Sequence, residues 1–405
     1  MAAPVVRSKI GLALAGGGPV GGIYEVGAMA ALAEALEGLD FNGFDYFVGV
    51  SSGGFVAAAV ANGMHPRSLA RMLVENDTDE MFDPELLLRP AFGEYLKRAL
   101  SVPPLLFASF RNYFSDPLHM GLFESLQRLS YALPSGIFDN AGVDELLRRM
   151  FSANGRTNDF RELKHKLFLV ATDLDSGESV AFGGNGYDDI PISLAVQASA
   201  ALPGLFPPVN IGGRHFVDGA LIKTLHASVA LREGADLVIC INPLVPFDSV
   251  MAARHSRPDV RSLALEHLVD GGLPVVLSQT FRAIIHSRMR TGMARYDLEY
   301  KNSDVVLFEP KPDDEEMFFT NVFSYSSRSR LCEHAYQATR CDLYRRRHLL
   351  GPIFERHGIH LNVPVLRDRS RSLLPAKRRS HLASTIASLD SSLSDLSNWL
   401  ETQTS

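Results

Sequence analysis

Residues 10–22, IGLALAGGGPVGG, decide the fold class of this chain. The first six of them form a continuous apolar run, which is typical of a strand that is buried on both faces of a sheet. A glycine-rich loop follows at once, and residues 23–36 then have the composition of a helix, rich in Ala, Met, Leu and Glu. A strand, a tight loop and a helix in direct succession indicate the start of a parallel α/β sheet.

The same order returns in the residues that follow. Residues 44–50 form a second apolar run, and residues 52–62 form a second helix-like segment rich in Ala and Val. Further strand-like runs stand at 167–173, 235–242 and 303–308, with helices expected over 192–201 and 273–298. The alternation predicts an α/β fold with a mainly parallel sheet on which helices pack.

Composition and charge exclude several classes of protein. Of the 405 residues, 46% are hydrophobic and 21% are charged, which is globular and rules out a fibrous or wholly disordered chain. A net charge of −6 gives no support for a nucleic-acid partner. The three cysteines, Cys240, Cys332 and Cys341, form no CxxC pair, so neither a disulfide framework nor a structural zinc site is expected.

Membrane-spanning and secretory segments are not expected either. No window of 18 apolar residues occurs, and residues 1–9 lack the apolar stretch of a secretory signal. The sequence therefore predicts a cytoplasmic protein that contacts a membrane, if at all, from one side as a peripheral protein.

A candidate nucleophile lies between the second strand and the second helix. Residues 49–53, GVSSG, match the pattern G-x-S-x-G, in which glycines allow the sharp turn that lifts a serine hydroxyl above the sheet. Gly49 and Gly53 would supply that freedom, and Ser51 would be the nucleophile. The alternative is an ordinary strand-to-helix turn.

The glycine loop, Gly16 to Gly21, fits the pattern G-x-G-x-x-G and has two interpretations. A dinucleotide site needs an acid at the end of the second strand, but Ser51 and its neighbours occupy that place and Asp45 stands at the strand's start. The other interpretation is an oxyanion hole made of backbone N–H groups. Pro19 has no N–H, so Gly17 and Gly18, with Gly16, are the candidate donors.

An activated serine needs a base. Asp218 follows a short strand and is followed by Gly219 and Ala220, a pattern that also suits a simple turn. Histidine is the alternative base; the candidates are His215 and His226 near Asp218, and His334, His348, His357 and His360 late in the chain.

Four segments in order resemble the patatin-like phospholipase family. Residues 16–22 resemble its glycine-rich motif, 49–54 its nucleophile elbow, 171–177 its central strand and turn, and 198–208 the helix and turn that lead to the D-G-A of 218–220. The resemblance covers residues 8–231. The family's glycine loop usually carries a basic residue, whereas Val20 or Gly21 stands there in this chain.

The resemblance implies a three-layer α/β/α fold and a Ser–Asp dyad of Ser51 and Asp218, with Gly16, Gly17 and Gly18 as oxyanion donors. It implies hydrolysis of phospholipids, lysophospholipids, acylglycerols or small esters through an acyl-enzyme, with no metal and no cofactor. An acyltransferase that uses the same dyad and a non-catalytic lipid-binding protein are the alternatives.

The remaining segments complete the expected organisation. A catalytic domain over 8–350 would carry a helical cap over 81–131, rich in Phe, Leu and Pro, as a wall for an acyl chain. A basic linker over 363–380 would precede a helix over 381–405 whose leucines follow a heptad spacing. That helix has two interpretations, a homo-oligomer contact and, with the linker, a contact with anionic membrane lipid.

Overall fold

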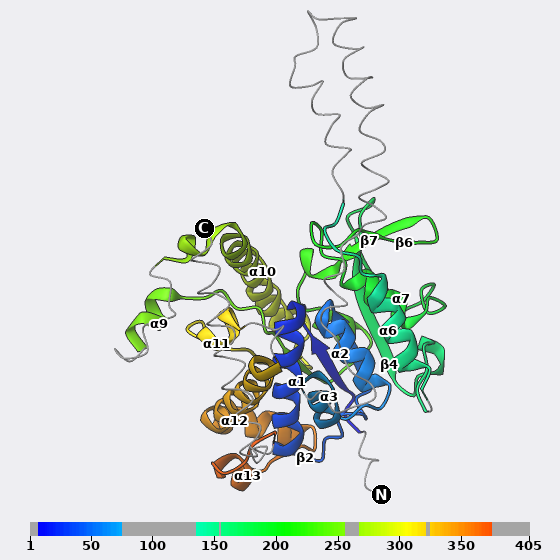
Figure 1. Ribbon diagram of the computed structural model, residues 1–405. Helices are drawn as coiled ribbons and strands as arrows, with labels where there is room; N and C mark the ends of the chain where they lie inside the picture. The colour runs from blue at the N-terminus through cyan, green and yellow to red at the C-terminus, as the bar shows by residue number, and fades with distance from the viewer. Residues whose placement is uncertain (1–6, 75–134, 154, 256–266, 321–324, 375–405) are drawn as a thin grey trace, which may run out of the picture.

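The computed structural model describes residues 7–74, 135–153, 155–255, 267–320 and 325–374 (Figure 1). Within them, eight strands form one sheet and two short strands form another. The large sheet contains β1 (Ile10–Leu14), β3 (Tyr46–Val50), β4 (Lys166–Asp173), β5 (Ser179–Phe182), β6 (Val209–Ile211), β7 (Arg214–Asp218), β8 (Leu237–Ile241) and β9 (Asp304–Phe308). The small sheet pairs β2 (Leu36–Glu37) with β10 (His360–Leu361).

The centre of the large sheet is parallel. β4, β3, β1, β8 and β9 lie side by side in that order and run in the same direction. The sequence prediction of a mainly parallel sheet is therefore confirmed. β5 and β7 pair with β4 in the antiparallel direction, and β6 pairs antiparallel with β7, an arrangement that no period in the sequence had indicated.

Three strands pair with β4, and their registers place two of them on one edge. β5 pairs with residues 169–172 of β4. β3 pairs with residues 166–170 and β7 with residues 171–173, so both overlap β5 and must use the opposite edge. Because β7 runs antiparallel to β4, its last residue, Asp218, pairs directly after the last residue of β3, and the carboxyl ends of β3 and β7 meet.

Helices cover both faces of the sheet, as Figure 1 shows for the face that α1 and α2 cover. One layer contains α1 (Gly18–Ala35), α2 (Ser52–Ala61), α3 (Pro66–Val74), α6 (Ala141–Phe151), α7 (Ile192–Ser199) and α12 (Tyr325–Arg356). The other layer contains α8 (Ala227–Arg232) and α10 (Gly272–Glu299). Shorter elements are α9 (Ser249–His255), α11 (Glu315–Phe319), α13 (Val363–Arg367), η3 (Phe160–Glu162), η4 (Gly219–Leu221) and η5 (Leu268–Gly271).

Alternation along β1 explains the two layers. Leu12 and Leu14 pack in the larger core with α1, whereas Ala13 and Ala15 face the core that α8 and α10 close. Small residues on that second face let α8 approach closely, since a Cβ at Gly11 would lie 3.0 Å from Cβ of Ala230. The three-layer α/β/α fold expected from the sequence is thus confirmed.

Several expectations fall at the edge of the described residues or beyond it. The cap over 81–131 and the heptad helix over 381–405 lie outside them. The start of the expected linker is folded: α13 and the residues after it bury Leu366 and Leu373, and Arg371 forms an ion pair with Glu34 of α1. Among the described helices, none is both long enough and apolar enough to cross a bilayer.

Candidate active site

Ser51 lies at the turn between β3 and α2 in a backbone conformation that residues with a side chain rarely adopt. Its φ is 54° and its ψ is −125°, and within the described ranges it alone among non-glycine residues has a positive φ. Such a strained backbone costs on the order of 1–3 kcal/mol and persists only where the surroundings impose it. The strain marks Ser51 as a candidate functional residue by a route independent of its motif.

The two glycines of the pentapeptide are required by space. A Cβ at Gly49 would lie 2.5 Å from the carbonyl oxygen of Gly53, and a Cβ at Gly53 would lie 2.4 Å from that of Ala15. Both distances are shorter than any real Cβ contact, so the chain can pass here only without side chains. The end of β1, the turn and α2 are therefore packed backbone against backbone.

Ser199 of α7 holds the turn from the other side. Its hydroxyl accepts a 2.9 Å hydrogen bond from the N–H of Ser51 and donates a 2.6 Å bond to the carbonyl of Val170 in β4. The side chain is fully buried. Sequence reasoning included Ser199 only as part of a matching segment, and no local pattern had marked it as a support for Ser51.

Asp218 ends β7 and is almost fully buried, with 2% of its surface exposed. One carboxylate oxygen, Oδ1, accepts a 2.8 Å hydrogen bond from the N–H of Ala220, and the side chain of Ser51 lies close enough to the carboxylate to lower its pKa. Gly219 permits the turn, because a Cβ there would lie 2.3 Å from the carbonyl oxygen of Val170. The structure thus brings Ser51 and Asp218 into contact.

Burial governs the charge state of this carboxyl. It raises the pKa of Asp218 to about 6, and the hydrogen bond from Ala220 and the nearby Ser51 side chain offset only part of that rise. In the described part of the chain, no cation forms an ion pair with Asp218. The carboxylate is consequently a stronger base than an aspartate in water, whose pKa lies near 3.9.

The glycine loop lies against both residues. A Cβ at Gly16 would lie 3.1 Å from Cβ of Ser51 and 3.1 Å from Cβ of Ala220. The N–H of Gly16 donates a long 3.4 Å bond to the carbonyl of Thr224. Gly17 is the N-cap of α1 and Gly18 its first residue, positions whose N–H groups have no acceptor within the helix.

Close packing holds the loop in place. A Cβ at Gly17 would lie 2.6 Å from Cγ of Pro243, and one at Gly21 would lie 2.9 Å from the same atom. Gly18 has a φ of 59°, in the left-handed region. Pro243, in the segment after β8, is a supporting residue that the sequence alone had not indicated.

The histidine candidates have other partners or environments. His215 contacts Asn210, His334 pairs with Asp314, His357 contacts Ser8 and Asp304, and His348 and His360 are exposed. His226 is buried and desolvation lowers its pKa to about 3, which keeps it neutral. Within the described residues, no hydrogen bond joins a histidine to Ser51.

Metal and dinucleotide sites find little support in this geometry. The described residues contain no group of three or more His, Cys, Asp or Glu side chains placed to hold a metal ion. Asp45 stands just before β3 and accepts a 2.8 Å hydrogen bond from the N–H of Ile10, at the end of the sheet opposite to the glycine loop. It is therefore not placed to meet a ribose beside the loop.

Comparison with solved structures gives weak likenesses. VipD from Legionella pneumophila is 16% identical with a TM-score of 0.35, covering 82% of this chain and 66% of that one. The type III effector ExoU of Pseudomonas aeruginosa gives the same identity and TM-score, covering 84% and 53%. The fold class follows instead from the strand order and the layers described above.

Comparison with curated sequences and families is more decisive. An NTE family protein of Mycobacterium tuberculosis, itself uncharacterized, is 27% identical over 245 residues, covering 60% of this chain. A second such protein, of Mycobacterium bovis, is 32% identical over 100 residues, covering 25% of this chain and 26% of its own length. The match spans about a third, 31%, of the first relative's length.

The sequence model of patatin-like phospholipase matches residues 12–231, more than half of the chain. The chain therefore belongs to the patatin-like phospholipase family, a family of lipid ester hydrolases, as its ordered motifs had indicated.

Proposed function

We propose that this protein is a serine lipolytic acyl hydrolase, of the phospholipase A, lysophospholipase or esterase type, that works through a Ser51–Asp218 dyad. The observation that carries the proposal is that the strained Ser51 lies next to the buried carboxylate of Asp218 on one edge of β4. Family membership supports the reaction class. The geometry around the two residues supports their roles.

In the first half of the proposed reaction, Asp218 accepts the hydroxyl proton of Ser51 while Oγ attacks the acyl carbonyl carbon. The carbonyl π electrons move to oxygen and give a tetrahedral oxyanion. When the intermediate collapses, the bond to the leaving alkoxide breaks and the alkoxide takes the proton from Asp218. An alcohol leaves, and the acyl group remains on Ser51 as an ester.

In the second half, water takes the place of the serine hydroxyl. Asp218 accepts a proton from the water as its oxygen attacks the acyl-enzyme, and a second tetrahedral oxyanion forms. Collapse breaks the bond to Oγ of Ser51, which recovers the proton from Asp218. A carboxylic acid is released and the dyad returns to its starting state.

The oxyanion would be bound by backbone N–H groups of the glycine loop. Gly17 and Gly18 are the proposed donors, since the N–H of Gly16 points to Thr224. Loss of one such donor typically raises a barrier by about 2.7–4 kcal/mol. The positive end of the α1 dipole adds to the same field. No metal or cofactor takes part in this scheme.

The substrate proposed is an ester of a long-chain acid, met at the surface of a membrane from the cytoplasmic side. A raised but still moderate basicity of Asp218 suits alkoxide leaving groups better than amines, which favours esters over amides. The catalytic domain is proposed to span residues 8–350. The cap over 81–131 remains a predicted wall for the acyl chain, and the helix over 381–405 remains a predicted oligomer contact.

Labelling with a fluorophosphonate probe tests the nucleophile. We expect the full-length protein to be labelled at Ser51 and to hydrolyse p-nitrophenyl esters, and Ser51→Ala to lose both properties. Ser52→Ala is the matched control, because the neighbouring hydroxyl is buried and, among the described residues, has no hydrogen-bond partner. Undiminished hydrolysis by Ser51→Ala would overturn the proposal.

Product analysis separates hydrolysis from acyl transfer on the same dyad. With a lipid ester and an added alcohol, the proposed hydrolase releases mainly free fatty acid. Transfer of the acyl group to the alcohol would identify an acyltransferase instead. Binding of lipid without labelling of Ser51 or turnover would identify a non-catalytic lipid-binding protein.

A further inference from the structure

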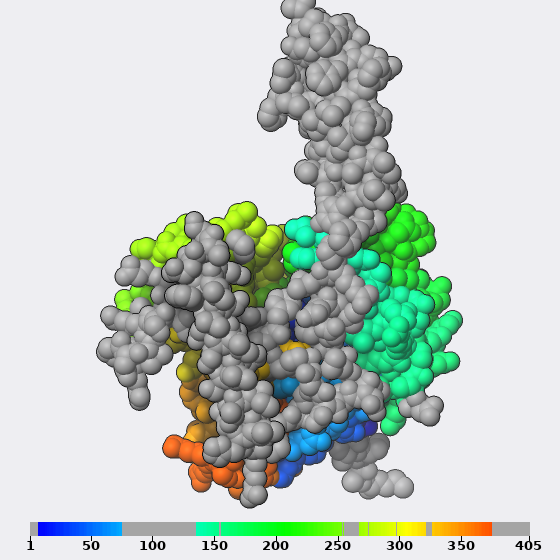
Figure 2. All heavy atoms as spheres, in the orientation of Figure 1, coloured from blue at the N-terminus to red at the C-terminus, as the bar shows by residue number. Residues whose placement is uncertain are grey.

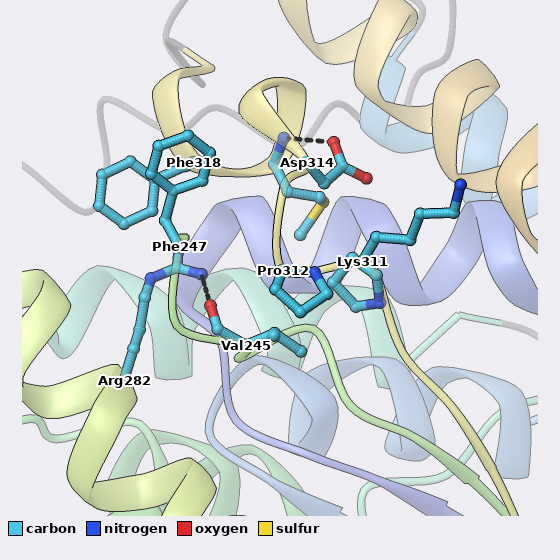
Figure 3. Close-up of a pocket in the computed structure, with 9 residues that line it drawn as sticks. Val245, Phe247, Arg282, Lys311, Pro312, Asp314 and Phe318 are labelled. Carbon is cyan, nitrogen blue, oxygen red and sulfur yellow. Dashed lines mark hydrogen bonds between the residues drawn. The ribbon is translucent and has the colours of Figure 1, made fainter. Parts of the chain in front are cut away.

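The first half of α10 is anchored at the end of the sheet that carries Ser51. Gln279 exchanges hydrogen bonds of 3.0 and 2.7 Å with the backbone of Phe247. Arg282 donates a 3.3 Å bond to the carbonyl of Val245, as Figure 3 shows. Both partners follow the carboxyl end of β8, in the same segment as Pro243, which packs on Gly17. This part of α10 therefore lies at the same end of the sheet as the glycine loop.

One face of that half exposes four large apolar side chains, which we call the apolar row: Leu273, Leu277, Phe281 and Ile284. Between 44% and 69% of the surface of each is exposed. Their spacing of four, four and three residues places them on one side of the helix. Figure 2 shows this part of the chain at the molecular surface.

The same face continues into a cationic region in the second half of α10. Arg288, Gly292, Arg295 and Glu299 continue the apolar row beyond Ile284 by steps of four, four, three and four residues. They line a cleft of about 650 Å³, completed by a set of hydroxyl, aromatic and basic side chains. We call it the basic cleft; its cations are Lys223, Arg232, Arg288 and Arg295.

Three of these four cations have no carboxylate partner among the described residues. Arg295 pairs with Glu299, but in the described residues no carboxylate oxygen lies within 4.0 Å of Lys223, Arg232 or Arg288. Lys223 Nζ donates to Ser228 at 3.0 Å and lies 4.6 Å from the centre of the Tyr296 ring.

Within the part of the chain that the structure describes, Arg232 and Arg288 donate hydrogen bonds to backbone carbonyls only. Arg232 donates to the carbonyl of Ser228 at 3.2 Å, and Arg288 to that of Leu221 at 3.0 Å. Desolvation, and then the nearby Arg232, lower the pKa of Lys223 to about 8, as expected for a cation held without a counter-ion. An anion bound in the cleft would raise the pKa of Lys223 and so offset both of these influences.

We infer that this face of α10 docks on an anionic phospholipid membrane, with the apolar row in the acyl region and a lipid phosphate in the basic cleft. Ile284 and Arg288 are one helical turn apart, which matches the step from acyl chains to phosphates at a bilayer surface. The inference rests on the proposed function only for its choice of a lipid surface. It assigns that surface to a part of the chain separate from the dyad.

A second copy of this chain fits the face poorly. In an antiparallel two-fold contact centred on the middle of α10, the cations of one copy would lie on the apolar row of the other, and a contact centred on the row itself would leave the basic cleft unfilled. With the helices parallel, unpaired cations would face each other, and like charges across an interface oppose association. An anionic lipid satisfies both halves of the face at once.

Sedimentation with vesicles tests the inference in the full-length Ser51→Ala protein, so that the result does not depend on hydrolysis. The vesicles are phosphatidylcholine alone and phosphatidylcholine with phosphatidic acid. We expect Lys223→Gln and Arg288→Gln each to weaken binding to the acidic vesicles about fivefold and to leave binding to neutral vesicles unchanged. We expect Phe281→Ser to weaken binding to both kinds of vesicle about tenfold or more.

Matched controls carry the same chemical changes elsewhere. Arg149→Gln removes an exposed cation from α6, and Leu349→Ser removes an exposed leucine from α12; neither should change binding. Thermal unfolding checks each variant, and Leu273→Ser replaces Phe281→Ser if the latter does not fold. Equal binding by all variants, or a loss that the controls share, overturns the inference. A change of oligomeric mass in Phe281→Ser without a change in vesicle binding also overturns it.

Discussion

Ser51 and Asp218 meet along a single edge of β4, where Val50 pairs with Val170 and Asp218 pairs with the next residue, Ala171. β3 brings Ser51 to this point in the parallel direction, and β7 brings Asp218 to it in the antiparallel direction. Their contact is therefore set by the register of a buried sheet. A one-residue slip of either strand would turn its side chains to the opposite face.

Replacing Ser51 separates strain from chemistry. We expect Ser51→Gly to be more stable than Ser51→Ala by about 1 kcal/mol, since relief of about 1–3 kcal/mol of backbone strain exceeds the extra unfolded-state freedom of glycine, about 0.4–1 kcal/mol. Both variants should lack esterase activity. Urea unfolding of the two proteins measures the difference, and equal stabilities would contradict the strain at this turn.

The stability of the native protein relative to Asp218→Asn should depend on pH in a defined direction. A pKa raised from 3.8 to about 6 means that the folded protein binds more protons than the unfolded chain between these values, so stability falls as pH rises through that window. At 1.36 kcal/mol per pKa unit, the ionised carboxylate costs roughly 3 kcal/mol at neutral pH. Asp218→Asn should therefore be inactive yet more stable than the native protein at pH 7.

Thermal unfolding across the acid range measures this effect, and the advantage of the asparagine variant should shrink as the pH approaches 4. Ala220 can still donate its N–H to the asparagine oxygen, so the turn is kept. If the stability of the native protein relative to the variant does not fall between pH 4 and 6, then Asp218 is not desolvated.

The rate of ester hydrolysis should follow the ionisation of the same carboxyl. Because the proposed base is the carboxylate, kcat/KM for a p-nitrophenyl ester should rise about tenfold per pH unit below pH 6 and level off above it. A pH-rate profile over the stable range measures the midpoint. A midpoint near 6.5 that shifts on replacing a histidine would point to a different base.

Two neighbouring glycines of α2 should respond in opposite ways to the same change. In Gly53→Ala the new Cβ would lie 2.4 Å from the carbonyl oxygen of Ala15, so we expect a loss of about 1–3 kcal/mol of stability and a displaced glycine loop with little activity. In Gly54→Ala the nearest atom, in Leu169, is 3.5 Å away, and helix propensity should add up to about 1 kcal/mol. Unfolding and esterase assays on both variants compare the two effects.

Ser199 should act as a positioning residue for the nucleophile. Ser199→Ala leaves the buried N–H of Ser51 without its acceptor, which costs about 1–3 kcal/mol. We expect kcat to fall by about tenfold or more with KM little changed, because the turn rather than substrate binding is disturbed. Ser193→Ala, on the same helix and bonded to Asn158, should lower stability while kcat is retained.

Much of the central fold could be predicted because its signals are local. The apolar runs became β1, β3, β4, β8 and β9, and the helix expected over 273–298 became α10. Gly49, Gly53 and Gly219 could be recognised because a close backbone approach leaves glycine as the only residue that fits. These features are written in consecutive residues, so periodicity and motif spacing detect them.

The supports of the site could not be predicted in the same way. Ser199 contacts Ser51 and Pro243 contacts Gly17, each across a long separation in sequence. The residues next to Ser199 and Pro243 in sequence are those of an ordinary helix and an ordinary loop. The antiparallel arrival of β7 depends on which edge of β4 is free, a property of the assembled sheet. Lys223 and Arg288 become neighbours only when α10 packs on the sheet.

Asp218 owes its basicity to exclusion of water alone, since no cation or histidine in the described residues adjusts it. Any opening that wets this carboxyl would return its proton affinity toward that of a free aspartate and slow the reaction. A bound acyl chain that keeps water away from the carboxyl would have the opposite effect. The protein should thus be a poor catalyst for short, soluble esters in bulk solution and a better one when a bound chain or an aggregated lipid keeps the carboxyl dry.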